Sequence, residues 1–205
     1  MSSTELKPAS RTGPRADVHA ERTRPTSRRQ SPPVIAAVLA LAALVAALQS
    51  SATASVLRAM LVLVVVPCAV IDLRRRIIPN RITGPAALVA LLAGLALDSG
   101  GEPKRLLWAA ITGGFLLIAA LASPSGMGMG DVKLLGVMGL LLGPAVVIAL
   151  LVALLGNILG AAVMSSRRGV RSALKSHVPF GPYLAVGGIV AALVGDALIR
   201  AYLHG

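Results

Sequence analysis

The chain has 205 residues and a net charge of +12, and 56% of its residues are hydrophobic while only 14% are charged. A soluble domain carries about 25% charged residues, so this composition argues against a soluble protein and indicates an integral membrane protein. The basic residues lie between apolar runs without interleaved aromatic residues, a pattern that orients membrane helices and argues against nucleic-acid binding.

The first 32 residues form a distinct segment that is rich in Arg, Ser and Pro. Because this segment lacks apolar periodicity, we expect residues 1–32 to be a disordered basic cytoplasmic tail and residues 33–205 to form the membrane-embedded domain. The apolar run that follows the tail also resembles a signal peptide. The membranous character of the whole chain favours a retained first helix instead.

The apolar runs predict an all-α helix bundle that crosses the membrane about seven times, with one short span. The predicted spans are 33–49, 56–72, 82–98, 105–122, 131–142, 145–165 and 182–203. Lys and Arg gather in alternate connections, namely the tail, 72–81, 123–133 and 166–180. The positive-inside rule therefore places the N-terminus and these connections in the cytoplasm.

Three of the five acidic residues beyond the tail have simple local interpretations. Asp98 and Glu102 are expected to be solvated in an external loop, and Asp196 is four residues before Arg200, so the two can pair on one helix. The single Cys68 cannot form an intramolecular disulfide, and the chain has no CxxC pair. We therefore expect no structural zinc site, and no metal or organic cofactor is implied.

The other two acids, Asp72 and Asp131, are expected at the same cytoplasmic edge, because two spans separate them and return the chain to one face. Each also has a purely structural interpretation: Asp72 could pair with Arg75 or Arg76, and Asp131 could cap a helix that starts at Val132. As a pair, however, two nearby carboxyl groups share a proton, so one can activate water while the other donates to a carbonyl oxygen.

Three segments resemble conserved motifs of the type IV prepilin peptidases, which are aspartic proteases of membranes with a GxGD motif. The segments are "DLRRRIIPN" at 72–80, "GMGDVKL" at 128–134 and "VPFGPYLAVGG" at 178–188. The resemblance implies that Asp72 and Asp131 are the catalytic pair. It also implies an enzyme of the bacterial inner membrane that cleaves the leader peptide of prepilins or pseudopilins on the cytoplasmic side.

The same motifs imply a second group of residues that shape the site without transferring protons. Glycines before the second Asp would let a substrate strand come close, a lysine could stabilise the carboxylate or contact phospholipid, and a Pro-Asn pair would end one helix and start the next. The third motif would shape the site where the last helix opens. These site-shaping residues are Gly128, Gly130, Lys133, Pro79, Asn80, Phe180, Gly181 and Pro182.

Longer members of this family carry a cytoplasmic domain with CxxC motifs and an N-methyltransferase activity. This sequence has no CxxC motif and no soluble insertion after its first predicted span. It therefore resembles the short peptidase-only branch that serves Flp/Tad-type pili, and we expect no methyltransferase activity. The expected partners are the lipid bilayer and a substrate with a basic leader and an apolar helix, and homo-oligomerisation stays open. A proton- or cation-coupled transporter that uses the Asp pair as a relay is the main alternative, and a non-catalytic assembly factor is a third.

Overall fold

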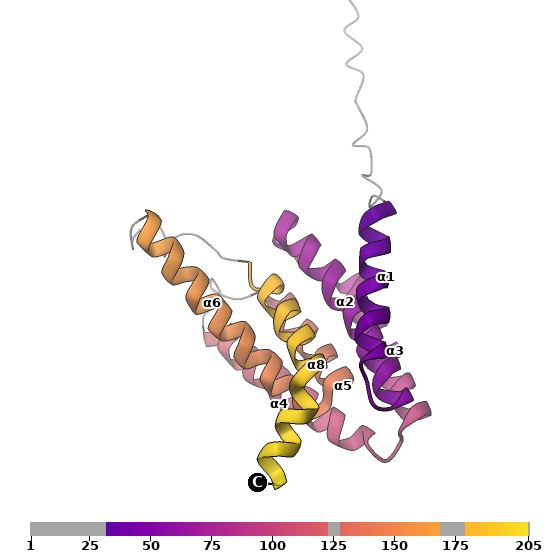
Figure 1. The fold of residues 1–205 in the computed structure, drawn as a ribbon. Helices are drawn as coiled ribbons and strands as arrows, with labels where there is room; N and C mark the ends of the chain where they lie inside the picture. The colour runs from indigo at the N-terminus through magenta and orange to yellow at the C-terminus, as the bar shows by residue number, and fades with distance from the viewer. Residues whose placement is uncertain (1–31, 123–127, 169–178, 205) are drawn as a thin grey trace, which may run out of the picture. The chain divides into compact units, whose positions relative to one another are not determined.

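The computed structural model describes residues 32–122, 128–168 and 179–204, and every regular element in these ranges is helical (Figure 1). The tail predicted over residues 1–32 lies outside the described residues apart from Pro32, as do parts of the connections predicted over 123–133 and 166–180. The helices are α1 (Pro32–Ala47), α2 (Ala52–Arg75), α3 (Asn80–Leu97), α4 (Glu102–Ala122), α5 (Met129–Leu142), α6 (Val146–Arg168) and α8 (Gly181–His204), with a 3-10 turn η1 over Gly143–Ala145.

The helices of the described chain have the length and hydropathy that a membrane requires. Five helical segments could span a bilayer by these criteria, and the apolar part of α1 is somewhat shorter. One of the five segments, Met129–Ser166, contains both α5 and α6 and so corresponds to two of the predicted spans. The prediction of an all-α membrane bundle is therefore confirmed, with helix boundaries that differ by a few residues from those expected.

Contacts between the helices show that α4, α5 and α6 run in alternating directions. The backbone of Gly139 in α5 lies against Ala109 in α4, and Gly136 lies against Gly113, so the two helices are antiparallel. The chain reverses again at Gly143, which has a positive φ of 58° that glycine tolerates without strain. As a result α5 and α6 pass through the bundle as two separate helices.

The last helix, α8, packs antiparallel to α6. Near its start, Tyr183 lies against the glycines at positions 156 and 160, and near its end Gly195 lies against Ala145. An aromatic ring thus packs closely against this small-residue stretch of α6. Because α8 runs antiparallel to α6, it runs in the same direction as α5, and both helices begin at the same end of the bundle.

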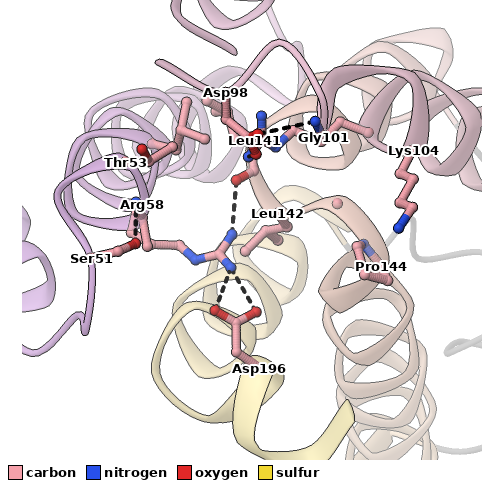
Figure 2. Close-up of a pocket in the computed structure, with 14 residues that line it drawn as sticks. Ser51, Thr53, Arg58, Asp98, Gly101, Lys104, Leu141, Leu142, Pro144 and Asp196 are labelled. Atoms are coloured by element: carbon pink, nitrogen blue, oxygen red, sulfur yellow. Dashed lines mark hydrogen bonds and ion pairs between the residues drawn. The ribbon is translucent and has the colours of Figure 1, made fainter. Parts of the chain in front are cut away.

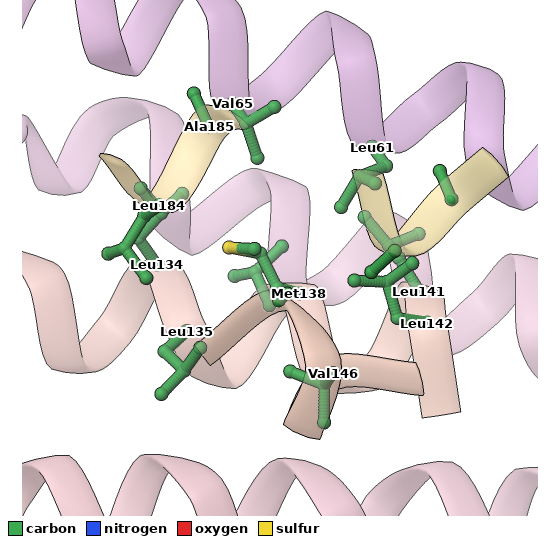
Figure 3. Packing of buried hydrophobic residues seen from close by; sticks show 14 of the residues in the cluster. Leu61, Val65, Leu134, Leu135, Met138, Leu141, Leu142, Val146, Leu184 and Ala185 are labelled. Carbon is green, nitrogen blue, oxygen red and sulfur yellow. The ribbon is translucent and has the colours of Figure 1, made fainter. Parts of the chain in front are cut away.

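The core of the bundle is built around α5, of whose fourteen residues nine are buried. Figure 3 shows Leu134 and Met138 of α5 among Leu61 and Val65 of α2 and Leu184 of α8. Large apolar side chains also cover the outer faces of the surrounding helices, among them Leu92, Ile118 and Leu155. Such outward-facing apolar residues suit a protein whose periphery contacts lipid, and the central position of α5 fixes the residues at its two ends.

Candidate active site

Asp72 lies in the last turn of α2, which stops because Arg76 adopts a left-handed backbone conformation with φ of 53°. Asp72 is only 6% exposed. Its Oδ2 atom accepts a hydrogen bond of 3.0 Å from the backbone N–H of Gly181, the first residue of α8. The carboxylate is therefore held at a helix N-terminus, where the partial positive charge of the helix stabilises an anion.

The ion pairs in the described ranges do not include Asp72. The structural alternative in which Asp72 pairs with Arg75 or Arg76 is therefore wrong. Both arginines are exposed at the end of α2. The Asp72 carboxylate instead faces the interior of the bundle and uses a backbone donor from a helix that is 109 residues away in sequence.

Asp131 lies in the first turn of α5 and is 7% exposed. The helix begins at Met129 with Gly128 as its N-cap residue, so the alternative in which Asp131 caps a helix starting at Val132 is wrong. Its Oδ1 atom has no hydrogen-bond partner among the described residues. A buried polar atom without a partner is costly, and this oxygen is thus available for a ligand or a proton.

The two acids predicted to form a pair lie close to each other at one end of the bundle, which we call the carboxylate end. Asp72 is near enough to Asp131 for its charge to act on the Asp131 carboxyl group. Their environments differ, because Gly181 donates a hydrogen bond to Asp72 whereas Asp131 has an oxygen without a donor in the described part of the chain. The two carboxyl groups therefore differ in the hydrogen bonds that surround them.

The segment that opens α8 shapes this site through its small size. A Cβ atom at Gly181 would come within 2.7 Å of the Asp72 Oδ2 atom, so only glycine lets the N–H group approach the carboxylate. Phe180 is buried and part of the hydrophobic core, and Pro182 is half-buried in the first turn of α8. The proline has no N–H to leave unpaired at this helix start, which suits its position.

The two glycines before Asp131 have different surroundings. A Cβ atom at Gly130 would come within 2.7 Å of the Cβ atom of Ile78, which is itself buried. The bare backbone at Gly130 is thus covered by the protein's own chain, whereas the sequence suggested space for a substrate strand. At Gly128 a Cβ atom would lie 3.3 Å from the Asp131 Oδ2 atom, so this glycine keeps the approach to the carboxyl group open.

Lys133 and Asn80 connect two helices at the carboxylate end. The Lys133 Nζ atom donates a hydrogen bond of 3.0 Å to the Asn80 Oδ1 atom, and both side chains are exposed. Asn80 is the first residue of α3, and Pro79 precedes it in an extended conformation, as expected for a pair that separates two helices. The bond from Lys133 fixes the start of α3 beside the start of α5.

No group of three or more His, Cys, Asp or Glu side chains that could hold a metal ion occurs within the described ranges. Among the described residues, the candidate site contains two carboxyl groups, the backbone donor at Gly181 and the neighbouring Lys133. Such a set can take up and release protons at a buried position close to the end of three helices.

The surroundings of Asp196 and Glu102 differ from those predicted from the sequence. Asp196 does not pair with Arg200. It pairs instead with Arg58 of α2, whose Nη2 atom lies 2.9 Å from the Asp196 Oδ1 atom (Figure 2). Glu102 is not solvated: it is 1% exposed and pairs with Arg105, 3.3 Å away. These groups lie at the end of the bundle opposite the carboxylate end.

Arg58 is the functional candidate that sequence reasoning missed. It is 5% exposed, although it lies in a span that was predicted from its apolar neighbours alone. A lone arginine within an apolar run is energetically costly in a membrane, and such residues commonly have a functional partner. The sequence therefore contained a signal that Arg58 has a specific role. Its partners, Leu141 and Asp196, could not be identified because they are 83 and 138 residues away.

Comparisons with known proteins agree with the motifs. A family model described as the type IV leader peptidase family matches residues 56–165, which include both Asp72 and Asp131. A protein named prepilin leader peptidase/N-methyltransferase from Aeromonas salmonicida (strain A449) is 32% identical over 181 residues, which cover 83% of this chain and 60% of that protein.

Two further relatives carry the same printed name. The one from Bacillus subtilis (strain 168) is 35% identical over 142 residues, or 66% of this chain and 54% of that protein. The one from Pseudomonas aeruginosa is 33% identical over 141 residues, or 65% of this chain and 48% of that protein. The chain thus spans about half to three fifths of the length of these relatives. No solved structure matches it significantly.

Proposed function

Because the chain belongs to the type IV leader peptidase family, we propose that it is an aspartic endopeptidase that removes the leader peptide of prepilins or pseudopilins. The observation that carries this proposal is the pair of buried carboxyl groups, Asp72 of α2 and Asp131 of α5, which lie at one end of the bundle, near enough for the charge of one to act on the other. A buried carboxyl pair can polarise water and protonate a carbonyl oxygen without a metal.

The asymmetry of the pair suggests a role for each acid. Negative charge on Asp72 is stabilised by the Gly181 N–H group and the N-terminus of α8, whereas the Asp131 Oδ1 atom has no described donor. In the proposed mechanism Asp131 carries the shared proton and Asp72 the charge. Asp72 removes a proton from water as the water oxygen attacks the scissile carbonyl carbon, and Asp131 donates its proton to the carbonyl oxygen.

Breakdown of the tetrahedral intermediate reverses these roles. Asp131, now charged, takes a proton from a hydroxyl group of the intermediate, and Asp72 gives its proton to the departing amine as the carbon–nitrogen bond breaks. The pair then returns to its starting state with one proton. The mechanism needs both carboxyl groups but no cofactor.

We place the site at the cytoplasmic face of the inner membrane. Exposed basic residues cluster at the carboxylate end, at positions 74, 75, 76, 81 and 133. At the opposite end, Arg58 and Arg105 are neutralised by ion pairs with acids. The positive-inside rule therefore favours a cytoplasmic carboxylate end, where a basic leader that has not crossed the membrane would present its cleavage site.

We further propose that the substrates are Flp/Tad-type prepilins and that the 205 residues act as a peptidase alone. The relatives' printed names join peptidase and N-methyltransferase, but the longer family members place the second activity in a CxxC-bearing region, and this sequence has a single cysteine. Mass spectrometry of the processed product, with S-adenosylmethionine present, would show an unmethylated N-terminus. A gain of one methyl group that depends on this chain would contradict the peptidase-only assignment.

The test of the main proposal is co-expression of the chain with candidate prepilins. Loss of the leader is scored as a mobility shift on a gel and verified by N-terminal sequencing. A prepilin should be processed by the parent chain and left intact by the variants that lack either acid. Unprocessed prepilin in the presence of correctly inserted parent protein would refute the proposal for that substrate.

A further inference from the structure

Arg58 occupies a position that the proposed mechanism does not use. Its Nη1 atom donates a hydrogen bond of 2.8 Å to the backbone carbonyl of Leu141, and its Nη2 atom donates to both carboxylate oxygens of Asp196 at 2.9 and 3.1 Å (Figure 2). One buried guanidinium group therefore connects α2, α5 and α8. We call this group of three residues the Arg58 junction.

The three helices that meet at the Arg58 junction are the three that build the candidate active site at the other end of the bundle. Asp72 lies on α2, Asp131 on α5 and Gly181 on α8. At 1.5 Å per residue, the junction and the site are separated by roughly 20 Å along α2 and α8 and by about 15 Å along the shorter α5. Polar bonds thus join α2 to α8 near both ends, and they join α5 to both helices at the Arg58 junction.

The packing between the Arg58 junction and the candidate active site can transmit a shift of one helix along its axis from one end of the bundle to the other. Met138 of α5 is buried between Leu61 and Val65 of α2 and the backbone of α8, where a Cβ atom at Gly188 would come within 2.9 Å of its Cε atom. Close-packed cores of this kind shift as units. Pro67 interrupts the hydrogen bonding of α2, but a bend there changes the direction of the helix and not its length.

A polar junction fixes the register of helices in a way that apolar contacts do not. Apolar contacts are not directional, whereas the hydrogen bonds from Arg58 require one axial position of the three helices. In lipid no water replaces a lost bond, so a buried arginine that is shifted from its partners is strongly disfavoured. Removal of one partner of a buried ion pair is likewise destabilising.

From this placement we infer that Arg58 is a positioning residue that sets the axial register of α2 against α5 and α8, and so places Asp72 at hydrogen-bond distance from Gly181. This inference rests on the proposed peptidase function only for its effect on catalysis. Its effect on geometry is independent of any activity. The two effects are therefore measured separately.

The geometric test uses a disulfide as a reporter of the contact between α2 and α8. Cys68 is first replaced by alanine, and the pair Asp72→Cys and Gly181→Cys is introduced. An ideal Cβ atom at Gly181 would lie 3.0 Å from the Asp72 Cβ atom, so a small separation of the helices brings the pair to the range of about 3.5–4.5 Å that a disulfide requires. The rate of disulfide formation is followed in detergent by loss of maleimide labelling. Only the monodisperse fraction from size-exclusion chromatography is used, so misfolded protein does not contribute.

In this background, Arg58→Gln should slow disulfide formation about tenfold or more, and Asp196→Asn should slow it to a lesser degree because the bond to Leu141 survives. Lys104→Gln is the matched control, since Lys104 is an exposed cation that lines the same cavity of about 390 Å³ without a described ion pair. It should leave the rate unchanged. If Arg58→Gln forms the disulfide as fast as its parent, the inference is wrong.

The catalytic test uses the otherwise native chain and an intact prepilin that the parent chain cleaves. Arg58→Lys keeps the positive charge but cannot bond to both partners from one planar group, so kcat should fall about tenfold while KM stays within about twofold. A purely structural role would lower the yield or the melting temperature and leave the kcat of the folded fraction at the parent value, and that result would overturn the inference. If no prepilin is cleaved even by the parent chain, the proposed function fails, and the disulfide rates still decide the role of Arg58.

Discussion

The backbone N–H group of Gly181 donates a 3.0 Å hydrogen bond to the carboxylate of Asp72 and joins the first residue of α8 to the last turn of α2. Neither residue alone defines a site. Together they hold a buried carboxylate at a helix N-terminus and set it apart from Asp131, whose Oδ1 atom has no hydrogen-bond partner among the described residues. The predictions below follow from this difference and from the packing that maintains it.

Replacement of either acid should abolish processing. Asp72→Asn and Asp131→Asn are nearly isosteric but cannot exchange the proton, so the cleavage rate should fall to about 1% of the parent rate or less. The protein should still insert and accumulate, as judged by immunoblot of membranes. Asp98→Asn is the control, because Asp98 is exposed and its ion pair with Arg105 lies at the end of the bundle opposite the two acids, and it should retain most activity. Full activity in either of the first two variants would contradict the aspartic mechanism and favour a proton or cation relay.

Gly181→Ala tests the donor at Asp72 without removing an acid. The added Cβ atom would come within 2.7 Å of the Asp72 Oδ2 atom, so the N–H group must withdraw, and kcat should fall about tenfold or more. Gly114→Ala is the matched control in α4, since nothing lies within 4 Å of its Cβ position. Steady-state cleavage of purified prepilin measures both variants. Equal kcat values for the two would show that the Gly181 contact is unimportant for catalysis.

Packing of α4 against α5 should limit thermal stability. A Cβ atom at Gly139 would come within 2.8 Å of the backbone nitrogen of Ala109, which cannot move without displacing α4, so Gly139→Ala should cost about 1–3 kcal/mol of unfolding free energy. Gly136→Ala, in the same helix but with nothing within 4 Å of its Cβ position, should be neutral or slightly stabilising. Thermal unfolding in detergent compares the two. Equal melting temperatures would indicate that the helices are not in close contact at Gly139.

The proposed orientation can be tested with topology reporters. A reporter fused after Arg76, between α2 and α3, should register in the cytoplasm, and one fused after Gly100, between α3 and α4, should register outside. Alkaline phosphatase and fluorescent-protein fusions give opposite signals at the two positions, so each serves as the other's control. The reverse pattern would move the carboxylate end to the external face and remove the basis for cytoplasmic cleavage.

Much of the fold could be predicted because the helices follow from local pattern. Apolar runs of membrane-spanning length predicted the seven α-helices found in residues 32–122, 128–168 and 179–204, and two spans between Asp72 and Asp131 were enough to predict that both lie at one end. The Gly181 donor and the Arg58 junction could not be predicted. They depend on the register between α2 and α8, which lie more than 100 residues apart, and no local pattern in a single sequence encodes that register.

The same reasoning explains the incorrect expectations for Asp196 and Glu102. Arg200 was chosen as the partner of Asp196 because i and i+4 residues are neighbours on a helix surface. In the folded chain Asp196 pairs with Arg58 from another helix. An unpaired charge costs more free energy at the buried Arg58 than at the exposed Arg200, so the pair with Arg58 is favoured. Glu102 looked like a loop residue because charged neighbours surround it, yet its side chain packs against Gly94 of the preceding helix.

The position of Gly181 at the start of the last helix has a consequence for the biosynthesis of the protein. Asp72 enters the membrane with α2, and Asp131 follows with α5, while the donor that holds the Asp72 carboxylate arrives only when α8 leaves the ribosome. A nascent chain that ends before α8 contains both acids but lacks the hydrogen bond that holds the Asp72 carboxylate. The contact between Gly181 and Asp72 can therefore form only after the start of α8 has been synthesised, later than either acid.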